Sequence, residues 1–545
     1  MPTLQWVTRD VDVTRAEAVP YRLLEPVAEL GAGDPTTGNM LIQGDNLDAL
    51  KALLPYYAGR VKCIYIDPPF NTGAAFPNYA DHLPHSEWLG FMFSRLVLLR
   101  DLLTPDGVIC VQLDDTEAHY LKVLMDEVFG RDNYINTLVV STNKAFGFKS
   151  TSDGLFRQTN FLSIYGRDRA KVRLREDVLL IEKGYDSQYK WVFENVGAPE
   201  TAWTWRNIAD VVATQLGFEN SRVARRSNPD ALNRAVAHFA LENHERVFRT
   251  ASVSGGALAK RRATIAHSKQ VRDRIVRHPD DDMDYRFIAG ERVLMYSERL
   301  REVDGRLVPA EIATDLWTDI PVEGLAAEGG VDFPKGKKPE RLLRRVIGMS
   351  TAPGDLVLDS FLGSGTTAAV AHKMGRRWIG IEMGDHAVTH CVPRLRKVIE
   401  GEQGGVSQAV GWTGGGGFTF HRLGEPVFDE TGALRPGIPF RVLAAHIWFS
   451  EADTRAHAQA HEEAGPFLGV VGEQGLALLY NGVLGDRRPA GGNVLTSATL
   501  AAVRAAAGGF DGPLTIYGEA SRLGPERLRA ERVTFKQTPY DVRTR

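Results

Sequence analysis

The feature that most constrains the fold is the apolar run 61–66, which ends in the string Asp67-Pro68-Pro69-Phe70. A short apolar run predicts a buried strand, and the prolines end it because they lack an N–H and fix φ at roughly −65°. Open α/β sheets bind ligands just beyond the carboxyl ends of their strands. The string therefore sets a carboxylate, acceptor carbonyls and an aromatic face where a flat amine could bind. The alternative is an ordinary proline-rich turn with Asp67 as a turn residue.

A second segment far along the chain has the pattern strand, glycine loop, helix, strand. The strand is 356–359, the helix 368–374 and the second strand 378–381, which ends at Glu382. Glycines in such a loop let the backbone approach a ligand, and an acid about twenty residues on suits a ribose diol. Since Gly363 and Gly365 also satisfy the looser dinucleotide fingerprint, a nicotinamide or flavin site stays open as an alternative.

Together the two segments resemble the DNA amino-methyltransferases, which methylate adenine N6 or cytosine N4 with S-adenosylmethionine. The catalytic motif precedes the cofactor motif, which is the order of the permuted (beta) class. Further matches resemble the modification subunits of type III restriction systems: 41–50 (LIQGDNLDAL), the tyrosine pair 56–57, the string 67–73 and 338–343 (KPERLL). The resemblance spans about residues 36–145 and 330–400. It implies a Rossmann-like α/β methyltransferase fold built from two sequence halves.

The resemblance also implies a role for each motif residue. Asp67 and the carbonyl of Pro68 would accept the two protons of the target amine, Pro69 would stiffen the turn, and Phe70 would stack on a base flipped out of the duplex. S-adenosylmethionine is the implied cofactor, and no metal is required. An Asp at the head of the motif favours adenine, whereas cytosine-N4 members usually carry Ser there. The implied cofactor-binding residues are Asp45, Lys338, Asp359, Phe361, Gly363, Gly365, Thr366 and Glu382.

Two other functions remain as competing hypotheses. An oxidoreductase that binds a dinucleotide at the Gly363 loop would leave the string 67–70 unexplained. A DNA-binding subunit without activity would have no need for intact Asp67, Phe70 and Glu382.

A basic segment lies between the two motif regions. From 221 to 277 the chain has thirteen Lys or Arg and four Asp or Glu, although the whole chain has a net charge of −3. Basic residues neutralise phosphates, and arginine also reads guanine edges. Members of the beta class place their target-recognition domain here, so the resemblance implies binding of double-stranded DNA; solvated helix faces are the alternative. The candidate DNA-binding residues are Arg225, Arg226, Lys260, Arg261, Arg262 and Arg272.

The pattern of elements predicts five parts in the chain. They are an N-terminal arm (1–36), a catalytic half (37–145), a target-recognition insertion (146–315), a cofactor half (330–400) and, after a glycine-rich junction, a small α/β module (418–545) for docking or dimerisation. Within the catalytic half, a helix is predicted over 86–103, a turn over 104–107, a strand over 108–113 and a helix up to 129. The apolar stripe of the first helix, which is predicted to be core, consists of Trp88, Phe91, Met92, Leu96 and Leu99.

Composition indicates an ordinary globular chain, with 43% hydrophobic and 24% charged residues. The sequence has no signal peptide and no apolar stretch of membrane-spanning length, so we expect a cytoplasmic prokaryotic enzyme that does not contact a membrane. Three widely separated cysteines predict buried free thiols. His457 and His461 share a helical face but are better explained as a solvated face than as a metal site. The type III resemblance implies a helicase–nuclease partner subunit and a homodimer.

Overall fold

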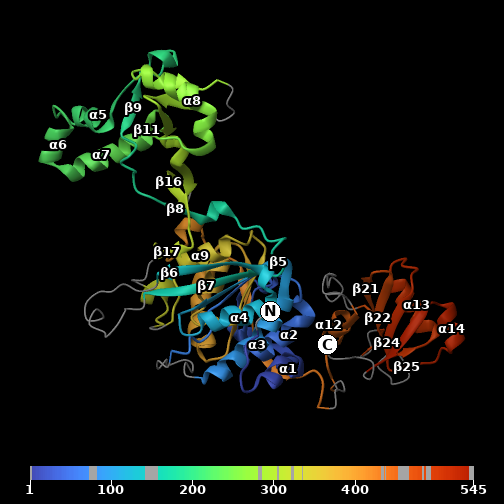
Figure 1. Ribbon diagram of the computed structural model, residues 1–545. Coiled ribbons are helices and arrows are strands. Elements are labelled where there is room, and N and C mark those ends of the chain that lie inside the picture. The colour runs from blue at the N-terminus through green and yellow to red at the C-terminus, as the bar shows by residue number, and fades with distance from the viewer. Residues whose placement is uncertain are drawn as a thin grey trace. The chain divides into compact units, whose positions relative to one another are not determined.

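The computed structural model describes residues 3–72, 83–141, 158–279, 285–303, 306–320, 325–333, 336–430, 435, 437–451, 465–480, 484–485 and 492–538. The chain forms two compact units, one of residues 1–178 and 314–545 and the other of residues 179–313 (Figure 1). No helix among the described residues has the length and apolar character that crossing a membrane requires.

The first unit is built on an eleven-stranded sheet with the order β1-β20-β3-β19-β18-β4-β5-β7-β6-β17, in which β2 pairs with β20. The five pairings from β20 to β5 are parallel, whereas β7 runs antiparallel to β5 and β6. The strands are β1 (Arg22–Pro26), β2 (Ala32–Gly33), β3 (Met40–Gln43), β4 (Val61–Ile66), β5 (Leu103–Leu113), β6 (Tyr134–Ser141), β7 (Thr159–Gly166), β17 (Leu316–Trp317), β18 (Leu356–Asp359), β19 (Arg377–Glu382) and β20 (Gly417–Pro426).

Strands β4 and β18 form the centre of this sheet. Every residue of β18 is buried, and so is every residue of β4 except Lys62. Continuous apolar strands of this kind are typical of parallel sheets covered on both faces. The predicted strands 61–66 and 356–359 are confirmed. So is the prediction that the three cysteines are free and buried.

Besides those of its C-terminal part, the unit that contains this sheet has eight described α-helices. Their bounds are α1 (Arg9–Ala18), α2 (Asn46–Tyr57), α3 (His85–Leu102), α4 (Ala118–Phe129), α9 (Glu340–Gly348), α10 (Thr366–Lys373), α11 (Val392–Ile399) and α12 (Phe440–Glu451). From β4 the chain passes through α3 to β5 on one side, and from β18 it passes through α10 to β19 on the other. Because such crossovers are right-handed, α3 and α10 lie on opposite faces. The boundary between β4 and β18 is therefore the topological switch point, where open α/β sheets bind ligands.

The parts of the chain join the sheet differently from the sequence-based prediction. Strand β7, inside the predicted insertion 146–315, pairs with β5 and β6, so the second unit begins only at residue 179. Strand β20 was assigned largely to the C-terminal module, yet it pairs with β3 and with β1 of the predicted arm. The predicted turn 104–107 lies within β5, where the pairing with β4 shifts register instead of breaking.

The second unit has its own core and a six-stranded antiparallel sheet with the order β10-β9-β11-β14-β13-β12. Phe193 and Phe248 stack at its centre with ring centroids 4.0 Å apart. A smaller sheet has the order β15-β16-β8. The elements are β8 (Leu180–Glu182), β9 (Trp191–Glu194), β10 (Thr204–Asn207), α5 (Ile208–Gln215), α6 (Ser221–Ser227), α7 (Pro229–Glu242), β11 (Val247–Ala251), α8 (Gly255–Gln270), β12 (Val276–Arg277), β13 (Arg286–Ile288), β14 (Glu291–Met295), β15 (Leu300–Val303) and β16 (Arg306–Ile312).

The C-terminal part contains a mixed sheet with the order β21-β22-β24-β26, in which β22 and β26 run parallel to β24 and β21 runs antiparallel to β22. Its core consists of aliphatic residues such as Leu479, Leu500 and Ile516. The elements are β21 (Phe467–Val471), β22 (Gln474–Leu478), β23 (Val494–Leu495), α13 (Ser497–Ala506), β24 (Leu514–Gly518), β25 (Ala520–Ser521), α14 (Pro525–Ala530) and β26 (Val533–Gln537). The histidines of the predicted solvated face, His457 and His461, lie outside the described residues.

Candidate active site and DNA-binding surface

A cavity lies at the switch point of the large sheet. Its empty volume is about 720 Å³ when the solvent space at its open mouth is included. Four parallel strands end beside it, because β3, β4, β18 and β19 all present their carboxyl ends at one edge. Its lining combines residues of the catalytic motif with residues of the cofactor half. The lining residues are Asp45, Asn46, Asp67, Pro69, Phe91, Phe333, Gly336, Ser360, Phe361, Gly363, Glu382, Met383 and His386.

The catalytic motif follows β4 directly and is held rigidly by α3. The indole Nε1 of Trp88 donates a hydrogen bond to the carbonyl oxygen of Pro69 at 2.9 Å. Because Trp88 is fully buried, its hydrogen bond anchors the turn to the core. The two prolines already restrict the backbone dihedral angles of this turn. Asp67 and Pro69 reach the cavity, and Pro68 and Phe70 lie beside them in the chain.

Lys338 lies beside Asp67 and Phe70 and is not among the residues that line the cavity. Its ammonium forms an ion pair with Oδ2 of Asp67 and lies 5.1 Å from the centroid of the Phe70 ring. Both charged side chains are mostly buried, with 15% and 16% of their surface exposed. The resemblance implies that Lys338 binds the cofactor; in the structure its amine lies against the carboxylate of Asp67 and over the ring of Phe70.

A second anchor holds the residue that follows the catalytic motif. Asn71 has a φ of 60°, a conformation that only a few per cent of non-glycine residues adopt. Its side-chain amide donates to Oε1 of Glu117 at 2.8 Å, and Nδ1 of His85 contacts the same carboxyl group at 2.9 Å. Glu117 is buried at the start of α4, so it ties the catalytic loop to the neighbouring helix.

The loop after β3 contributes Asp45 and Asn46. Asp45 caps α2 by accepting a hydrogen bond from the backbone N–H of Leu47 at 2.8 Å, and half of its side chain stays exposed. Arg95 of α3 donates to Oδ1 of Asn46 at 2.5 Å and pairs with Asp45 at 3.2 Å. Asn46 in turn donates to the carbonyl oxygen of Ser360 at 2.8 Å, which joins this loop to the one after β18.

Two phenylalanines form an aromatic wall of the cavity. The rings of Phe91 and Phe361 lie 5.9 Å apart, and the Arg95 guanidinium lies 3.6 Å from the centroid of Phe91. Phe361 was predicted to bind cofactor. Phe91 was predicted to be core with the rest of its stripe, and it differs because it lines the cavity, unlike fully buried Trp88 and Met92.

Glu382 ends β19 and joins three parts of the site. Its Oε2 accepts a hydrogen bond from the N–H of Gly363 at 2.6 Å, and its Oε1 accepts from Met383 N–H at 2.8 Å. Nε2 of His386 lies 2.9 Å from the same Oε1. His386 is buried against Phe333, and sequence reasoning missed both. One carboxylate thus fixes the glycine loop and faces the cavity.

The remaining predicted cofactor-binding residues, Asp359, Gly365 and Thr366, lie at the two ends of the glycine loop. Asp359 accepts from the N–H of Phe361 at 2.9 Å and from the Thr367 hydroxyl at 2.5 Å. Burial raises the pKa of Asp359 to about 7, although these hydrogen bonds oppose the shift. Gly365 has a φ of 81° and precedes α10, and Thr366 is buried. Asp359, Gly365 and Thr366 are not among the residues lining the cavity.

The lining of the cavity fits a flat, cationic nucleoside better than a dinucleotide. It includes three carboxylates, Asp45, Asp67 and Glu382, and its described residues include no lysine or arginine. A pyrophosphate would face no lysine or arginine among the described lining residues, whereas a sulfonium beside a flat base suits carboxylates and aromatic walls. Moreover, the N–H of Gly363 already donates to Glu382, so it does not point at a phosphate. The chemistry of the site therefore argues against the nicotinamide or flavin alternative.

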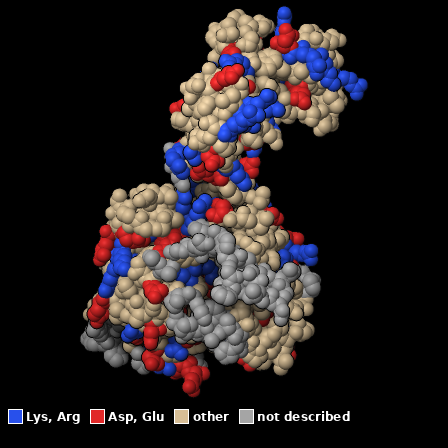
Figure 2. All heavy atoms as spheres, turned by 90° about the vertical axis from the view of Figure 1, so that its left-hand side faces the viewer, with Lys and Arg blue, Asp and Glu red and all other residues tan. Residues whose placement is uncertain are grey.

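The candidate DNA-binding residues all lie in the second unit, over whose surface lysines and arginines gather in the upper part of Figure 2. Five of the six are exposed: Arg225 and Arg226 of α6, Lys260 and Arg262 of α8, and Arg272. Arg261 differs from the prediction because it is buried. Its guanidinium lies 3.7 Å from the centroid of Tyr285, and Arg292 covers the same ring at 4.0 Å. Arg261 therefore packs inside the unit instead of facing a ligand.

No group of three or more His, Cys, Asp or Glu suited to hold a metal occurs within the described ranges.

Comparison with known proteins supports this picture. The family of DNA methylases matches residues 61–254 and 260–392. The probable type III restriction-modification enzyme HindVI Mod subunit of Haemophilus influenzae is 36% identical over 416 residues, which are 72% of this chain and 54% of that protein. The type III EcoPI Mod subunit of Escherichia phage P1 is 27% identical over 61% of this chain and 55% of its own. The chain thus spans about half the length of these relatives.

Among solved structures, PvuII DNA methyltransferase (cytosine-N4-specific) covers 67% of this chain and 89% of its own, with 14% identity and a TM-score of 0.32. A superposition at this level adds nothing to the assignment. The family match extends over more than half of the chain and includes both the catalytic motif and the glycine loop. The chain therefore belongs to the DNA methylase family.

Proposed function

We propose that this protein is a site-specific DNA methyltransferase that transfers a methyl group from S-adenosylmethionine to the N6 amine of adenine in double-stranded DNA. The observation that supports this most strongly is the single cavity lined by Asp67 and Pro69 of the catalytic motif and by Phe361, Gly363 and Glu382 of the cofactor half. A methyl donor and an amine acceptor must meet within bonding distance, and one cavity at the switch point provides for both.

The chain offers matching contacts for each part of the cofactor. When bound, S-adenosylmethionine supplies a methyl group activated by a positive sulfonium. Glu382 would accept hydrogen bonds from the ribose hydroxyls, and the wall of Phe91 and Phe361 would contact flat or apolar groups. Asp45, half exposed at the mouth of the cavity, would accept from the adenosine end.

Catalysis then follows from what Asp67 does to the target amine. The lone pair of an adenine amine is delocalised into the ring, so the nitrogen is a poor nucleophile. Hydrogen bonds from its two N–H groups to the Asp67 carboxylate and the Pro68 carbonyl would favour a tetrahedral nitrogen with a usable lone pair. The surplus proton of the methylated amine would pass to Asp67 and on to water.

Entry of the target base into the site would involve Phe70 and Lys338. A target inside the duplex stack cannot be reached, so the nucleotide must be flipped, and Phe70 would stack on it. In the structure the Lys338 ammonium pairs with Asp67 and lies over Phe70. The amine of the incoming base would take the place of this ammonium at the carboxylate.

The choice of adenine over cytosine is based on the Asp at position 67, since cytosine-N4 members of the family usually carry Ser there. The relatives support a wider role, because they are named as modification subunits of type III restriction-modification enzymes. We propose the same role for this chain, with a helicase–nuclease subunit as partner, a homodimeric state and action on DNA in the prokaryotic cytoplasm.

For the DNA-binding surface, adjacent arginines of α8 provide a matched pair. Arg262→Ala is expected to weaken DNA binding and lower the salt slope of log K by roughly 0.9, the value for one lost phosphate contact, with little change in Tm. Arg261→Ala should instead lower the free energy of unfolding by about 1–2 kcal/mol and leave the slope unchanged, because its guanidinium packs on Tyr285. Fluorescence anisotropy across a salt series, with thermal melts, measures both; equal effects on the slope would contradict the assignment.

The proposed function is tested by incubating the full chain with unmethylated duplex DNA and methyl-labelled S-adenosylmethionine. Label should enter the DNA without any added metal. Binding of a nicotinamide or flavin dinucleotide in place of S-adenosylmethionine would overturn the proposal.

A further inference from the structure

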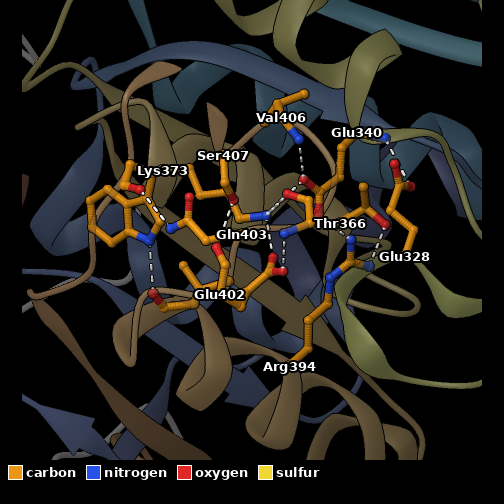
Figure 3. A network of polar contacts seen from close by, with 12 residues as sticks. Glu328, Glu340, Thr366, Lys373, Arg394, Glu402, Gln403, Val406 and Ser407 are labelled. Carbon is orange, nitrogen blue, oxygen red and sulfur yellow. Dashed lines mark hydrogen bonds and ion pairs between the residues drawn. The ribbon is translucent and has the colours of Figure 1, made fainter. Parts of the chain in front are cut away.

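A network of buried charges lies behind the glycine loop (Figure 3). At its centre is Glu340, the first residue of α9, which is fully buried. Its Oε2 accepts a hydrogen bond from Nζ of Lys373, and its Oε1 accepts from Nη2 of Arg394, each at 2.8 Å. Neither of these cationic side chains has any exposed surface. Glu340 therefore holds two buried cations that come from two different helices, α10 and α11.

The two cations lead to opposite ends of α10. Arg394 reaches the loop end, where its Nη1 donates to the Thr366 hydroxyl at 2.7 Å and to the Ser364 carbonyl oxygen at 3.3 Å. Lys373 is the last residue of α10, and besides Glu340 it contacts Glu402 and the carbonyl oxygen of Gly404. Only the Arg394 branch therefore contacts the glycine loop.

The residue that Arg394 holds is next to one that lines the cavity. Gly363 precedes Ser364, its N–H donates to Glu382 at 2.6 Å, and its carbonyl accepts from the Cys391 thiol at 3.1 Å. The loop is thus fixed by Glu382 on the cavity side and by Arg394 behind it. A shift of Ser364 would move Gly363 and the hydrogen bond that orients Glu382.

Burial of this network is costly if stability is its only role. Charges removed from water lose much of their solvation free energy, and a buried ion pair is often no more stable than an apolar replacement. If the network served stability alone, Lys373 and Arg394 would have equivalent roles, because each supplies one cation to the carboxylate of Glu340. The contact of a single branch with the loop indicates a positioning role.

We infer that Arg394, held by Glu340, is a positioning residue: by fixing Ser364 and Thr366 behind the cavity it keeps Gly363 and Glu382, which line the cavity, in the conformation that binds the nucleoside cofactor. The inference rests on the proposed function, since it takes S-adenosylmethionine as the ligand of this loop. It also gives a role to Glu340 in the motif 338–343: Lys338 of that motif contacts Asp67, whereas Glu340 holds the cofactor loop through Arg394.

The test compares Arg394→Met with Lys373→Met by calorimetric titration of S-adenosylmethionine into the full chain, with Tm measured for each variant. Both variants remove one cation from Glu340, so both should lower Tm. Arg394→Met is expected to raise the cofactor Kd about tenfold or more, and Lys373→Met to leave it within about twofold. At saturating cofactor, kcat of Arg394→Met should stay close to that of the wild type, because the reacting groups are unchanged.

Thr366→Val covers the case in which Arg394→Met does not fold, because it removes only the hydroxyl that accepts from Arg394 and keeps the ion pair. It should raise the cofactor Kd by about three- to tenfold. Equal Kd values for the two cation variants, or an unchanged Kd in Thr366→Val, would overturn the inference while wild-type binding still upholds the proposed function. A wild type that does not bind S-adenosylmethionine would overturn the proposed function, and the inference falls with it.

Discussion

Asp67→Ala is expected to lower the rate of methyl transfer by about a thousandfold or more while DNA and cofactor binding stay near their wild-type values. The loss of a preorganised group at the reacting centre has effects of this size. Asp67 accepts from the target amine in the proposed mechanism, but it is only one of several groups that line the cofactor cavity. Single-turnover transfer of labelled methyl groups, with separate binding titrations, distinguishes the two effects.

Two companion variants make the Asp67 result specific. Asp67→Asn keeps the shape of the side chain but loses its charge, so it should also lack most of the activity. Asp132→Ala, an exposed acid in the turn after α4, makes the same chemical change away from the cavity and should transfer methyl groups normally. An Asp67→Ala protein with more than about a tenth of wild-type activity would contradict the catalytic role, since one lost acceptor should cost at least tenfold.

The second large effect is expected at Glu382. Glu382→Ala should raise the Kd for S-adenosylmethionine about a hundredfold, because the change removes the proposed ribose acceptor and also leaves the N–H of Gly363 without its acceptor. His386 would lose its carboxylate as well. Glu382→Gln keeps one acceptor oxygen and should give an intermediate Kd.

The control for Glu382 is Glu400→Gln, which makes the same substitution at an exposed position just after α11 and should not change the Kd. The titrations are run at a temperature where each variant is folded. If cofactor binding by Glu382→Ala matched that of the wild type, Glu382 would be a structural acid and the cofactor site would have to lie elsewhere.

The elements and the site edge were predictable from sequence because they depend on local patterns. Continuous apolar runs are typical of buried parallel strands, and 61–66 and 356–359 fold as such strands. Since parallel strands present their carboxyl ends at one edge, Asp67 and Glu382 had to lie near one another. The sequence pattern thus identified the edge of the sheet at which the cavity lies.

Contacts between distant segments were not predictable in this way. Lys338 and Asp67 meet only because the chain places α9 next to β4, and no local pattern indicates which nearby charge an exposed-looking lysine will pair with. Phe91 belongs to an apolar helical stripe, and periodicity alone does not distinguish a core face from the wall of a cavity. Arg394 lies in an amphipathic helix whose sequence gives no sign that this arginine is buried.

Two strands join the large sheet from outside the predicted catalytic and cofactor halves, for a related reason. Strand β20 follows a run of glycines, which is typical of a junction, yet the run 414–416 has positive φ throughout and leads the chain into the sheet beside β3. Strand β7 lies inside the predicted insertion but pairs antiparallel with both β5 and β6. In both β7 and β20, pairing with a strand from another predicted part of the chain determines which sheet the strand joins.

The central claim is tested most directly by analysing nucleosides from unmethylated DNA that has been incubated with the protein and methyl-labelled S-adenosylmethionine. Mass spectrometry is expected to find labelled N6-methyladenine with the wild type and none with Asp67→Ala. Labelled N4-methylcytosine would contradict the choice of target base, although the site would stand. Labelled N6-methyladenine from Asp67→Ala at the wild-type rate would contradict the catalytic site itself.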